Sequence, residues 1–458
     1  MTDDHSTRAL SCYGSKILNT PNLDRLAAEG VRFTNAFVTN SLCAPARASV
    51  LTGCFSHLNG VRGNSEMADA VERLDPKLPT FPQLLQRAGY HTGIVGKWHL
   101  SDAPAGFHSW CVLPGQGLYF NPDFIDNGTK KTFTGYCTDI TTDLALEFLR
   151  RAPREKPFCL LYQHKAPHRP FQPAPRHAKL FERVELPHPE TYNDDYATRR
   201  LAREAEDMRF DISLAGDYKD LPPGLSPAER KNWIYQRFVK DYYGAVAGID
   251  ENLGRVLEYL DRNDLAEDTV VVYTTDNGFF LGDHGWYDKR FMYEPSLRVP
   301  LLVRYPRLGV AGRVEDRMTM NIDYAPTILD LAGVRVPAAM QGASLRPLLE
   351  GRSPGNWRRS VYYTYYENSW ALRQKGGAMT DPSFQYFTPH RVVPHRGVRT
   401  GRFKLIEYYG EDDYWELFDL QSDPQELKNL YGEPASAGIA ADLKRELARL
   451  RARYKDQA

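Results

Sequence analysis

TVVVYTTDNG, residues 269–278, is an apolar and β-branched run that ends in two oxygen-bearing side chains and a glycine. β-Branched residues favour strands, and a run without polar alternation is typical of a strand buried on both faces. Two further strand candidates end in polar clusters, HTGIVGKWHL (91–100) and PFCLLYQHKAPHRP (157–170). Because open α/β sheets place ligand sites beyond the carboxyl ends of their strands, we expect the three clusters to meet in space.

Helical segments separate the predicted strands. Residues 20–30 match a helix that begins with Thr-Pro and ends at glycine, and residues 80–89 match a second. A capping box, Ser-Pro-Ala-Glu at 226–229, begins a third helix, with apolar residues at helical spacing up to Leu260. The alternation predicts an α/β fold with a large, mostly parallel mixed sheet flanked by helices.

The character of the sequence changes near residue 350. The later segments predict antiparallel strands at 362–370, 396–410 and 414–424, and a helix at 438–454. We therefore predict a larger domain at residues 1–349 and a smaller α+β subdomain, with an antiparallel sheet, at 350–458. The Pro-rich and charged stretch 170–225 is expected to form a surface rim rather than core.

Composition excludes several classes of protein. The 458 residues carry 58 Lys and Arg against 58 Asp and Glu, so charge indicates neither a nucleic-acid nor a membrane partner. No apolar run reaches the roughly 18 residues of a membrane span. The six cysteines show neither a CxxC metal pattern nor the density of a disulfide scaffold.

Two pairs of residues with side-chain oxygens are candidate metal ligands. Asp3-Asp4 stands at the start of the chain, and Asp276-Asn277 follows the buried run at 269–275. Oxygen ligands at a strand end suit calcium or magnesium. The alternatives are a solvated acidic N-terminus for the first pair and an Asx turn for the second.

The segment LCAPARASVLTG, residues 42–53, places a cysteine at a predicted helix start. Pro45 suits the first turn, so Cys43 lies where free N–H groups and the helix dipole favour an anion. Arg47 lies near the same end, and its planar fork can hold oxyanions. The ordinary alternative is a buried cysteine that packs before a helix.

The pattern Cys43-x-Pro45-x-Arg47 resembles the signature of the sulfatase family, which the formylglycine-generating enzyme reads. Further motifs follow in family order, and the resemblance extends from residue 3 to about 432. These motifs are Ala48-Ser49 with Leu51-Thr52-Gly53, Gly96-Lys97-Trp98-His99, Lys165-Ala166-Pro167-His168-Arg169-Pro170, Asp276-Asn277-Gly278, Gly282-Asp283-His284-Gly285 with Lys289, Asp3-Asp4-His5 and Asn321-Ile322-Asp323-Tyr324-Ala325-Pro326-Thr327.

The resemblance implies a formylglycine-dependent sulfatase of the alkaline phosphatase superfamily, with residues 1–349 as its catalytic domain. Its substrate would be a sulfated carbohydrate or another sulfate ester, as in N-acetylglucosamine-6-sulfatases and in heparan- or mucin-desulfating enzymes. The resemblance also implies a bound Ca²⁺ ion. His284 would have no direct role and would at most support the metal site. The metal ligands would be Asp3, Asp4, Asp276, Asn277 and the modified Cys43.

The resemblance also implies catalytic roles beside the modified Cys43. Lys97 and Lys289 would contact the sulfate group, and Arg47 would steady the hydrated aldehyde. His168, helped by Lys289, would protonate the leaving group, and His99 would be the base that regenerates the aldehyde. Each of these residues also has an ordinary structural interpretation as a solvated lysine or a satisfied loop histidine.

Two other functions stay open from the sequence alone. A phosphonate monoester or phosphodiester hydrolase of the same superfamily can use the same modified cysteine. A catalytically silent sulfated-glycan-binding protein is the other, because relatives place an apolar strand before the Asp-Asp pair and only Met1-Thr2 precedes it here. We expect that strand to lie upstream of Met1, and its absence to leave a gap in the sheet. No secretory signal precedes Asp3, so localisation stays open.

Substrate choice would fall to the rim and the C-terminal subdomain. Candidate rim contacts lie between residues 365 and 398, and ordinary loop roles are the alternative for each. They are His390, His395 and Arg396.

Overall fold

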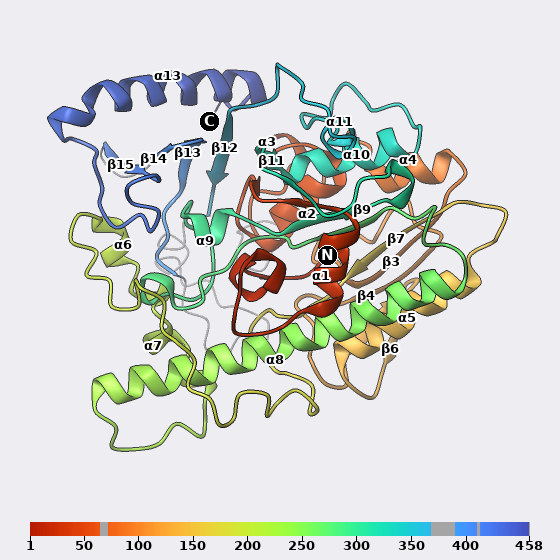
Figure 1. Ribbon diagram of the computed structural model, residues 1–458, viewed down its shortest axis with the longest axis horizontal. Coiled ribbons are helices and arrows are strands. Elements are labelled where there is room, and N and C mark those ends of the chain that lie inside the picture. Colours follow the sequence, from red (N-terminus) through yellow and green to blue (C-terminus); the bar gives the residue numbers. More distant parts are fainter. Residues whose placement is uncertain (65–71, 368–389, 410–412, 458) are drawn as a thin grey trace.

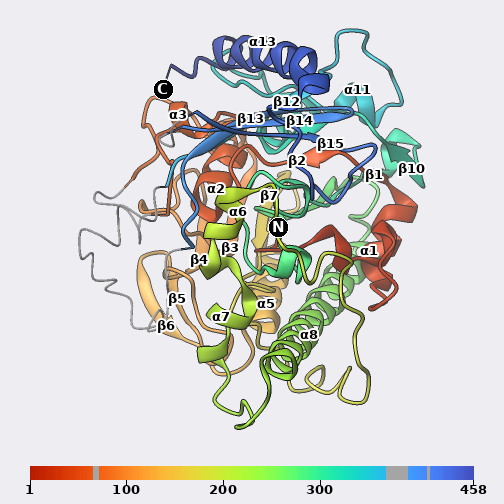
Figure 2. The same ribbon diagram turned by 90° about the vertical axis from the view of Figure 1, so that its left-hand side faces the viewer.

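The computed structural model describes residues 1–64, 72–367, 390–409 and 413–457. Strands lie between two groups of helices, and a C-terminal sheet with its own helix packs at one end (Figures 1 and 2). Within the described residues, no helix combines the length and the apolar character needed to cross a membrane.

Two mixed sheets form the core, in the strand orders β10-β1-β9-β8 and β6-β5-β4-β3-β7. The centre of the second is parallel, as expected, because β3 runs parallel to both β4 and β7. The strands are β1 (Val31–Phe33), β3 (His91–Lys97), β4 (Ser109–Leu113), β5 (Asp123–Asp126), β6 (Thr129–Thr132), β7 (Phe158–Gln163), β8 (Val271–Thr274), β9 (Leu301–Arg304) and β10 (Arg313–Glu315), with β2 (Ala36–Phe37) and β11 (Thr319–Met320) paired separately.

Helices cover both faces of this core. One group contains the long helix α8, which begins at the predicted capping box: Ser226 Oγ accepts from the Glu229 N–H, and the Glu229 carboxylate accepts from the Ser226 N–H. The other group contains the helix that begins at Cys43 (Figure 1). The first group is α1 (Pro21–Glu29), α5 (Cys137–Arg151) and α8 (Pro227–Arg262); the second is α2 (Cys43–Thr52), α4 (Phe81–Arg87) and α10 (Tyr324–Leu331), and the short helices are α3 (Ser56–Asn59), α6 (Arg200–Glu204), α7 (Phe210–Ser213), α9 (Glu294–Leu297) and α11 (Arg346–Leu349).

The C-terminal part contains the expected antiparallel sheet and terminal helix. Its sheet shares one hydrophobic core with aromatic residues of the loop after β8, such as Trp286 and Phe291. This shared core joins the subdomain closely to the larger part, and the boundary at residue 350 stays a prediction. The elements are β12 (Ser360–Tyr365), β13 (His395–Thr400), β14 (Phe403–Tyr408), β15 (Tyr414–Asp419) and α13 (Ala437–Tyr454).

The stretch 170–225 is exposed over much of its length, as expected, but part of it is buried. Phe171, Phe210 and Leu214 are buried against α8 in one hydrophobic cluster. Proline and charge content indicated the exposed part, and the aromatic residues among the charges supply the buried contacts. The segment therefore covers one part of α8 and carries Asp194 to the loop after β8.

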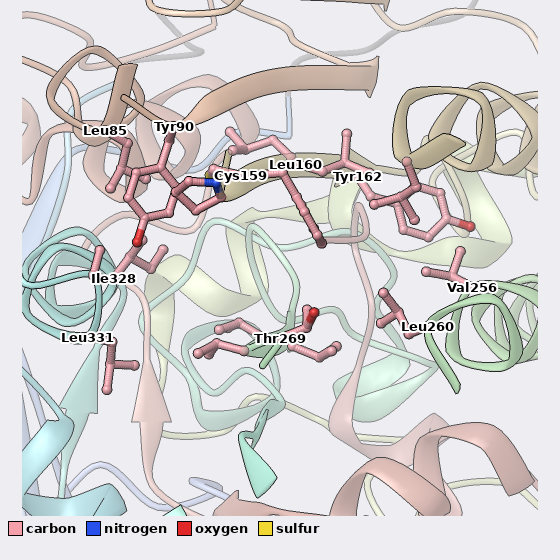
Figure 3. Close-up of a pocket in the computed structure, with 18 of the residues that line it drawn as sticks. Leu85, Tyr90, Cys159, Leu160, Tyr162, Val256, Leu260, Thr269, Ile328 and Leu331 are labelled. Carbon is pink, nitrogen blue, oxygen red and sulfur yellow. The ribbon is translucent and has the colours of Figure 1, made fainter. Parts of the chain in front are cut away.

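A gap separates β7 from β8. Met1 and Thr2 lie between these strands: the Met1 amine donates to Tyr162 O (2.7 Å), and the Thr2 N–H donates to Thr274 O (3.0 Å). A cavity of about 560 Å³, lined in part by Met1, lies between the two strands (Figure 3). Among the described residues, β7 and β8 each pair with another strand on one side only. Apolar and aromatic side chains line the cavity, including Leu85, Tyr90, Leu160, Tyr162, Val256, Leu260, Ile328 and Leu331.

Fusing five apolar, β-branched residues to the N-terminal side of Met1 is expected to stabilise the fold by roughly 3 kcal/mol. Thr2 already pairs parallel with Thr275, so the extension can continue as a parallel strand between β7 and β8. Each buried side chain contributes about 1.5–3 kcal/mol, against about 1–2 kcal/mol of backbone entropy per residue. Urea unfolding measures the change. A polar extension of equal length is the control, and equal stability of the two fusions would contradict the prediction.

Candidate active site

The three polar strand ends meet at one edge of the sheets, as the sequence predicts. Lys97 is the last residue of β3, the loop with His168 follows β7, and Asp276 follows β8. Asp3 and Asp4 enter beside them, because Thr2 pairs with Thr275. The close approach of β3 to β7 depends on Gly96, where a Cβ would lie 1.8 Å from a β7 carbonyl oxygen.

Cys43 begins helix α2 at the centre of this edge. Its Sγ lies 3.4 Å from Asp3 Oδ1, and the N–H of Ala44 donates to Asn64 Oδ1 (3.1 Å). Burial, and then the charge of Asp3, raise the pKa of the Cys43 thiol well above its usual value. The helix N-terminus therefore does not make a thiolate here, and the unmodified thiol is a poor nucleophile.

Three buried carboxylates converge next to Cys43. One oxygen each from Asp3, Asp4 and Asp276 lie within 4.8 Å of one another. Burial raises the pKa of Asp4 to about 7, and burial and Asp3 raise that of Asp276. Burial would also raise the pKa of Asp3, but Lys97 and other nearby cations hold it well below its usual value. Such crowding of carboxylates is costly unless cations offset it.

Three buried cations surround these carboxylates. Lys97 Nζ pairs with Asp3 Oδ2, and Lys289 Nζ lies 2.6 and 2.7 Å from the two oxygens of Asp4. Arg47 donates to Asp276 Oδ2 from Nε (3.1 Å) and Nη2 (2.9 Å). The predicted catalytic cations and metal ligands are thus direct partners in one cluster.

The donor set fits a hard divalent cation. Asn277 Nδ2 donates to Asp4 Oδ1 (2.6 Å), while its Oδ1 is buried and finds no hydrogen-bond partner in the described part of the chain. A buried oxygen of this kind is costly unless something positive meets it. Carboxylate and amide oxygens are the ligands that calcium takes, so the predicted ligands Asp3, Asp4, Asp276 and Asn277 lie where such an ion would need them.

The two predicted catalytic histidines lie at the same edge. His168 Nδ1 donates to Arg169 O (2.7 Å), which leaves Nε2 to face the cluster at 3.7 Å from Asp4 Oδ2. Burial lowers the pKa of His168 well below its usual value. His99 Nε2 lies 3.1 Å from Gln116 Nε2. His99 has a φ of 57° and Asp4 a φ of 64°, and strained backbone of this kind clusters at functional sites.

Two other predicted residues lie elsewhere. His284 Nδ1 lies 2.6 Å from Asp194 Oδ2, within an aromatic cluster, so it joins the 170–225 segment to the loop after β8. His395 is fully buried in β13, where its Nε2 accepts from the Met292 N–H (3.2 Å). Its prediction as a rim contact was wrong, because β13 is an inner strand of the C-terminal sheet.

Of the two remaining rim candidates, one lies next to Lys289 and the other lies on the C-terminal sheet. His390 is buried with Nε2 2.5 Å from Asp288 Oδ2, next to Lys289. Arg396 pairs with Glu407 on the C-terminal sheet. Most of the predicted rim segment, residues 368–389, lies outside the described residues.

The sequence interpretation missed three site residues. Gln163, inside the quoted strand-end cluster, accepts from Arg47 Nη1 (2.7 Å). Asn64 holds the first turn of α2, as described above. Gln116 accepts from Lys97 Nζ (2.6 Å) and follows β4, a short strand that the sequence interpretation did not identify. The signal available in the sequence was a polar residue shortly after the apolar run SWCVL (109–113), which is the pattern of the other strand ends at the site.

Comparison with known proteins agrees with this geometry. A family model described as "Sulfatase" matches residues 1–334, and one described as "N-sulphoglucosamine sulphohydrolase, C-terminal" matches residues 378–453. An N-acetylglucosamine-6-O-sulfatase of Bacteroides thetaiotaomicron is 41% identical over 100% of this chain and 86% of its own length. The human N-acetylglucosamine-6-sulfatase is 28% identical over 88% of this chain and 75% of its own length.

Solved structures share the fold. One, described as a complex with its substrate D-glucosamine-2-N,6-O-disulfate, has a TM-score of 0.87 and 39% identity over 100% of this chain and 97% of its own. The phosphonate monoester hydrolase of Agrobacterium radiobacter has a TM-score of 0.77 at 22% identity over 99% and 94%, which is a likeness of fold alone. The fold is therefore alkaline phosphatase-like, and the chain belongs to the sulfatase family of sulfuric ester hydrolases.

Proposed function

We propose that this sulfatase removes a 6-O-sulfate from a sulfated amino sugar, with formylglycine formed from Cys43 and a bound calcium ion. The observation that carries the proposal is the cluster of Cys43 with three carboxylates and three cations at the carboxyl ends of the strands. The 41% identical relative named for N-acetylglucosamine-6-O-sulfate supports the choice of sugar. A formylglycine-generating enzyme would be the maturation partner.

The calcium ion would be held by Asp3, Asp4, Asp276, Asn277 and the modified residue 43. When bound, it supplies fixed positive charge that neutralises sulfate oxygens. The three carboxylates are already matched by Arg47, Lys97 and Lys289. A divalent ion would therefore leave the site with excess positive charge, which suits an anionic ester.

The positions of the cations support their roles. Lys97 and Lys289 pair with different aspartates of the cluster, Asp3 and Asp4 respectively. With Asp3 and Asp4 engaged as metal ligands, both ammonium groups would be able to turn to sulfate oxygens. Arg47 is fixed at three points, by Asp276, Gln163 and a backbone carbonyl, so it orients the first turn of α2 around residue 43.

His168 is the proposed acid for the leaving oxygen. Its Nδ1 is engaged by a backbone carbonyl, so only Nε2 can exchange a proton with the substrate. Because burial keeps the free ring neutral, it has to gain a proton at Nε2 first, and an anionic ester beside it favours that protonation. His99 is the proposed base. Oxidation of Cys43 would supply a hydrated aldehyde in place of the buried, protonated thiol.

The sugar would lie over Lys289. His390, a predicted substrate contact, lies beside this lysine through its contact with Asp288, so it remains a candidate for the sugar hydroxyls. Asp288 and Arg290, which flank Lys289, have φ values of 72° and 89°. Such strained backbone is consistent with a segment held in shape for binding.

Rates on matched esters test this function. The enzyme, expressed with the formylglycine-generating enzyme, is expected to desulfate N-acetylglucosamine-6-sulfate and glucosamine-2-N,6-O-disulfate, retaining the N-sulfate of the second. Aryl sulfate should react more slowly, and phosphodiesters or phosphonate monoesters more slowly still. Faster phosphoester hydrolysis would favour the alternative hydrolase, and loss of the N-sulfate first would refute the proposed position of attack.

A further inference from the structure

The loop after β4 places one side-chain amide between two of the proposed catalytic residues. Gln116 is 6% exposed. Its Oε1 accepts from Lys97 Nζ at 2.6 Å, and its Nε2 lies 3.1 Å from His99 Nε2. Lys97 is fully buried. The amide therefore joins two side chains that come from the end of β3 and the turn that follows it.

The chemistry of these groups fixes the orientation of the amide. An ammonium group has donors only, so the group that faces Lys97 has to be the amide oxygen. This assignment directs the NH₂ group of Gln116 toward the ring of His99. An amide nitrogen donates and does not accept, so the ring atom it meets has to be unprotonated. In the neutral ring the proton then lies on Nδ1 of His99.

The loop that carries Gln116 is braced against the rest of the site. The Gly117 N–H donates to Pro114 O (3.1 Å), which closes a turn around Gln116. Tyr119, three residues on, is 2% exposed and donates from its hydroxyl to His168 O (2.6 Å). The ammonium of Lys165 lies 5.1 Å above the Tyr119 ring. A loop fixed at both ends can hold one amide rotamer, and the same loop contacts His168.

We propose that Gln116 is a positioning residue that holds Lys97 and fixes His99 in the tautomer protonated at Nδ1. The inference rests on the proposed function for its catalytic meaning, since His99 is the proposed base. The only lone pair of that tautomer is on Nε2, where Gln116 donates. The proton that His99 accepts in the cycle has to enter at Nε2, so this hydrogen bond opens when the base acts.

Two variants separate this role from simple packing. Gln116→Glu keeps the shape of the side chain, but its carboxylate can only accept, so it requires a proton on Nε2 of His99. Gln116→Leu removes both hydrogen bonds and leaves the tautomer to the preference of the free ring. For the glutamate variant kcat should fall roughly 10²-fold, because the wrong tautomer removes the contribution of one catalytic base. The fall in kcat should be smaller for the leucine variant.

The deciding measurement is ¹⁵N NMR of the full-length protein with labelled histidine, at mildly alkaline pH, with His99 assigned through a His99→Gln variant. The wild type should show protonated Nδ1 and unprotonated Nε2, and Gln116→Glu should reverse the pattern. Protonated Nε2 in the wild type, or an unchanged pattern in a folded Gln116→Glu variant, would overturn the inference. The wild-type spectrum needs no turnover, so a failure of the proposed function would appear separately, in the rates of the wild-type enzyme.

Discussion

Cys43→Ala is expected to lower sulfate ester hydrolysis by roughly 10⁴-fold or more, because it removes the nucleophile on which the other groups act. The fold should persist, since the change removes one buried sulfur atom from the first turn of α2. Initial rates on N-acetylglucosamine-6-sulfate measure the loss. Thermal unfolding of the same preparation separates it from misfolding.

Cys54→Ala is the matched control for this substitution. Cys54 is also buried and lies just beyond the end of α2, where its Sγ contacts the carbonyl oxygen of Ala339 (3.2 Å). It touches none of the carboxylates, so this variant should keep its activity. Full activity in Cys43→Ala would contradict the nucleophile assignment.

Peptide mapping gives an independent measurement on the wild type. In a host with the formylglycine-generating enzyme, the peptide with residue 43 should be lighter than its cysteine form and react with carbonyl probes. A Cys43→Ser variant has one hydroxyl in place of the two of a hydrated aldehyde. It should accumulate a sulfated serine and not turn over. Normal turnover by this variant would refute the proposed scheme.

The positions of the site residues were predictable from sequence where a strand pattern led to them. The run at 269–275 ends in Asp276, and the run at 91–97 ends in Lys97; both lie at the predicted edge. Parallel strands share their carboxyl edge, so recognition of the strands was enough to place their last residues together. The helix that begins at Cys43 could also be predicted from neighbouring residues, since Pro45 lies in its first turn.

Pairings that depend on distant segments could not be predicted in this way. Gln116 gains its role because β4 lies beside β3, and no local pattern in the five residues of β4 shows that neighbour. His395 was predicted as a rim contact, but its strand pairs with β12 and β14. Partners far along the chain determined both outcomes.

Asp276→Asn is expected to lower the free energy of unfolding by about 3 kcal/mol and to abolish stabilisation by calcium. Asp276 Oδ2 accepts both hydrogen bonds from Arg47, and its Oδ1 accepts from the N–H of Asp4 (3.1 Å). Asparagine can keep the contact with Asp4, but its NH₂ group then faces the guanidinium group. Arg47 is 2% exposed, so its charge would be left buried without a carboxylate.

The two parts of this prediction have separate measurements. Urea unfolding in the presence of a chelator reports the loss of the Arg47 pair alone. Unfolding with added calcium reports binding: the wild type should gain about 2.7 kcal/mol at a calcium concentration one hundred times the Kd, and Asp276→Asn should gain none. Activity should fall with the loss of calcium stabilisation.

Asp250→Asn tests whether the loss is specific to the cluster. Asp250 is 4% exposed, and its carboxylate accepts from the backbone N–H of Leu23 (2.9 Å) and from Asn22 Nδ2 (3.0 Å), so it joins α8 to the start of α1. Asparagine at position 250 faces no buried cation, so the free energy of unfolding should fall by only about 1 kcal/mol. Its calcium-dependent gain should equal that of the wild type, because Asp250 is not among the oxygens that converge beside Cys43. If Asp276→Asn gained as much from calcium as Asp250→Asn does, Asp276 would not be a ligand, and the metal site would have to lie elsewhere.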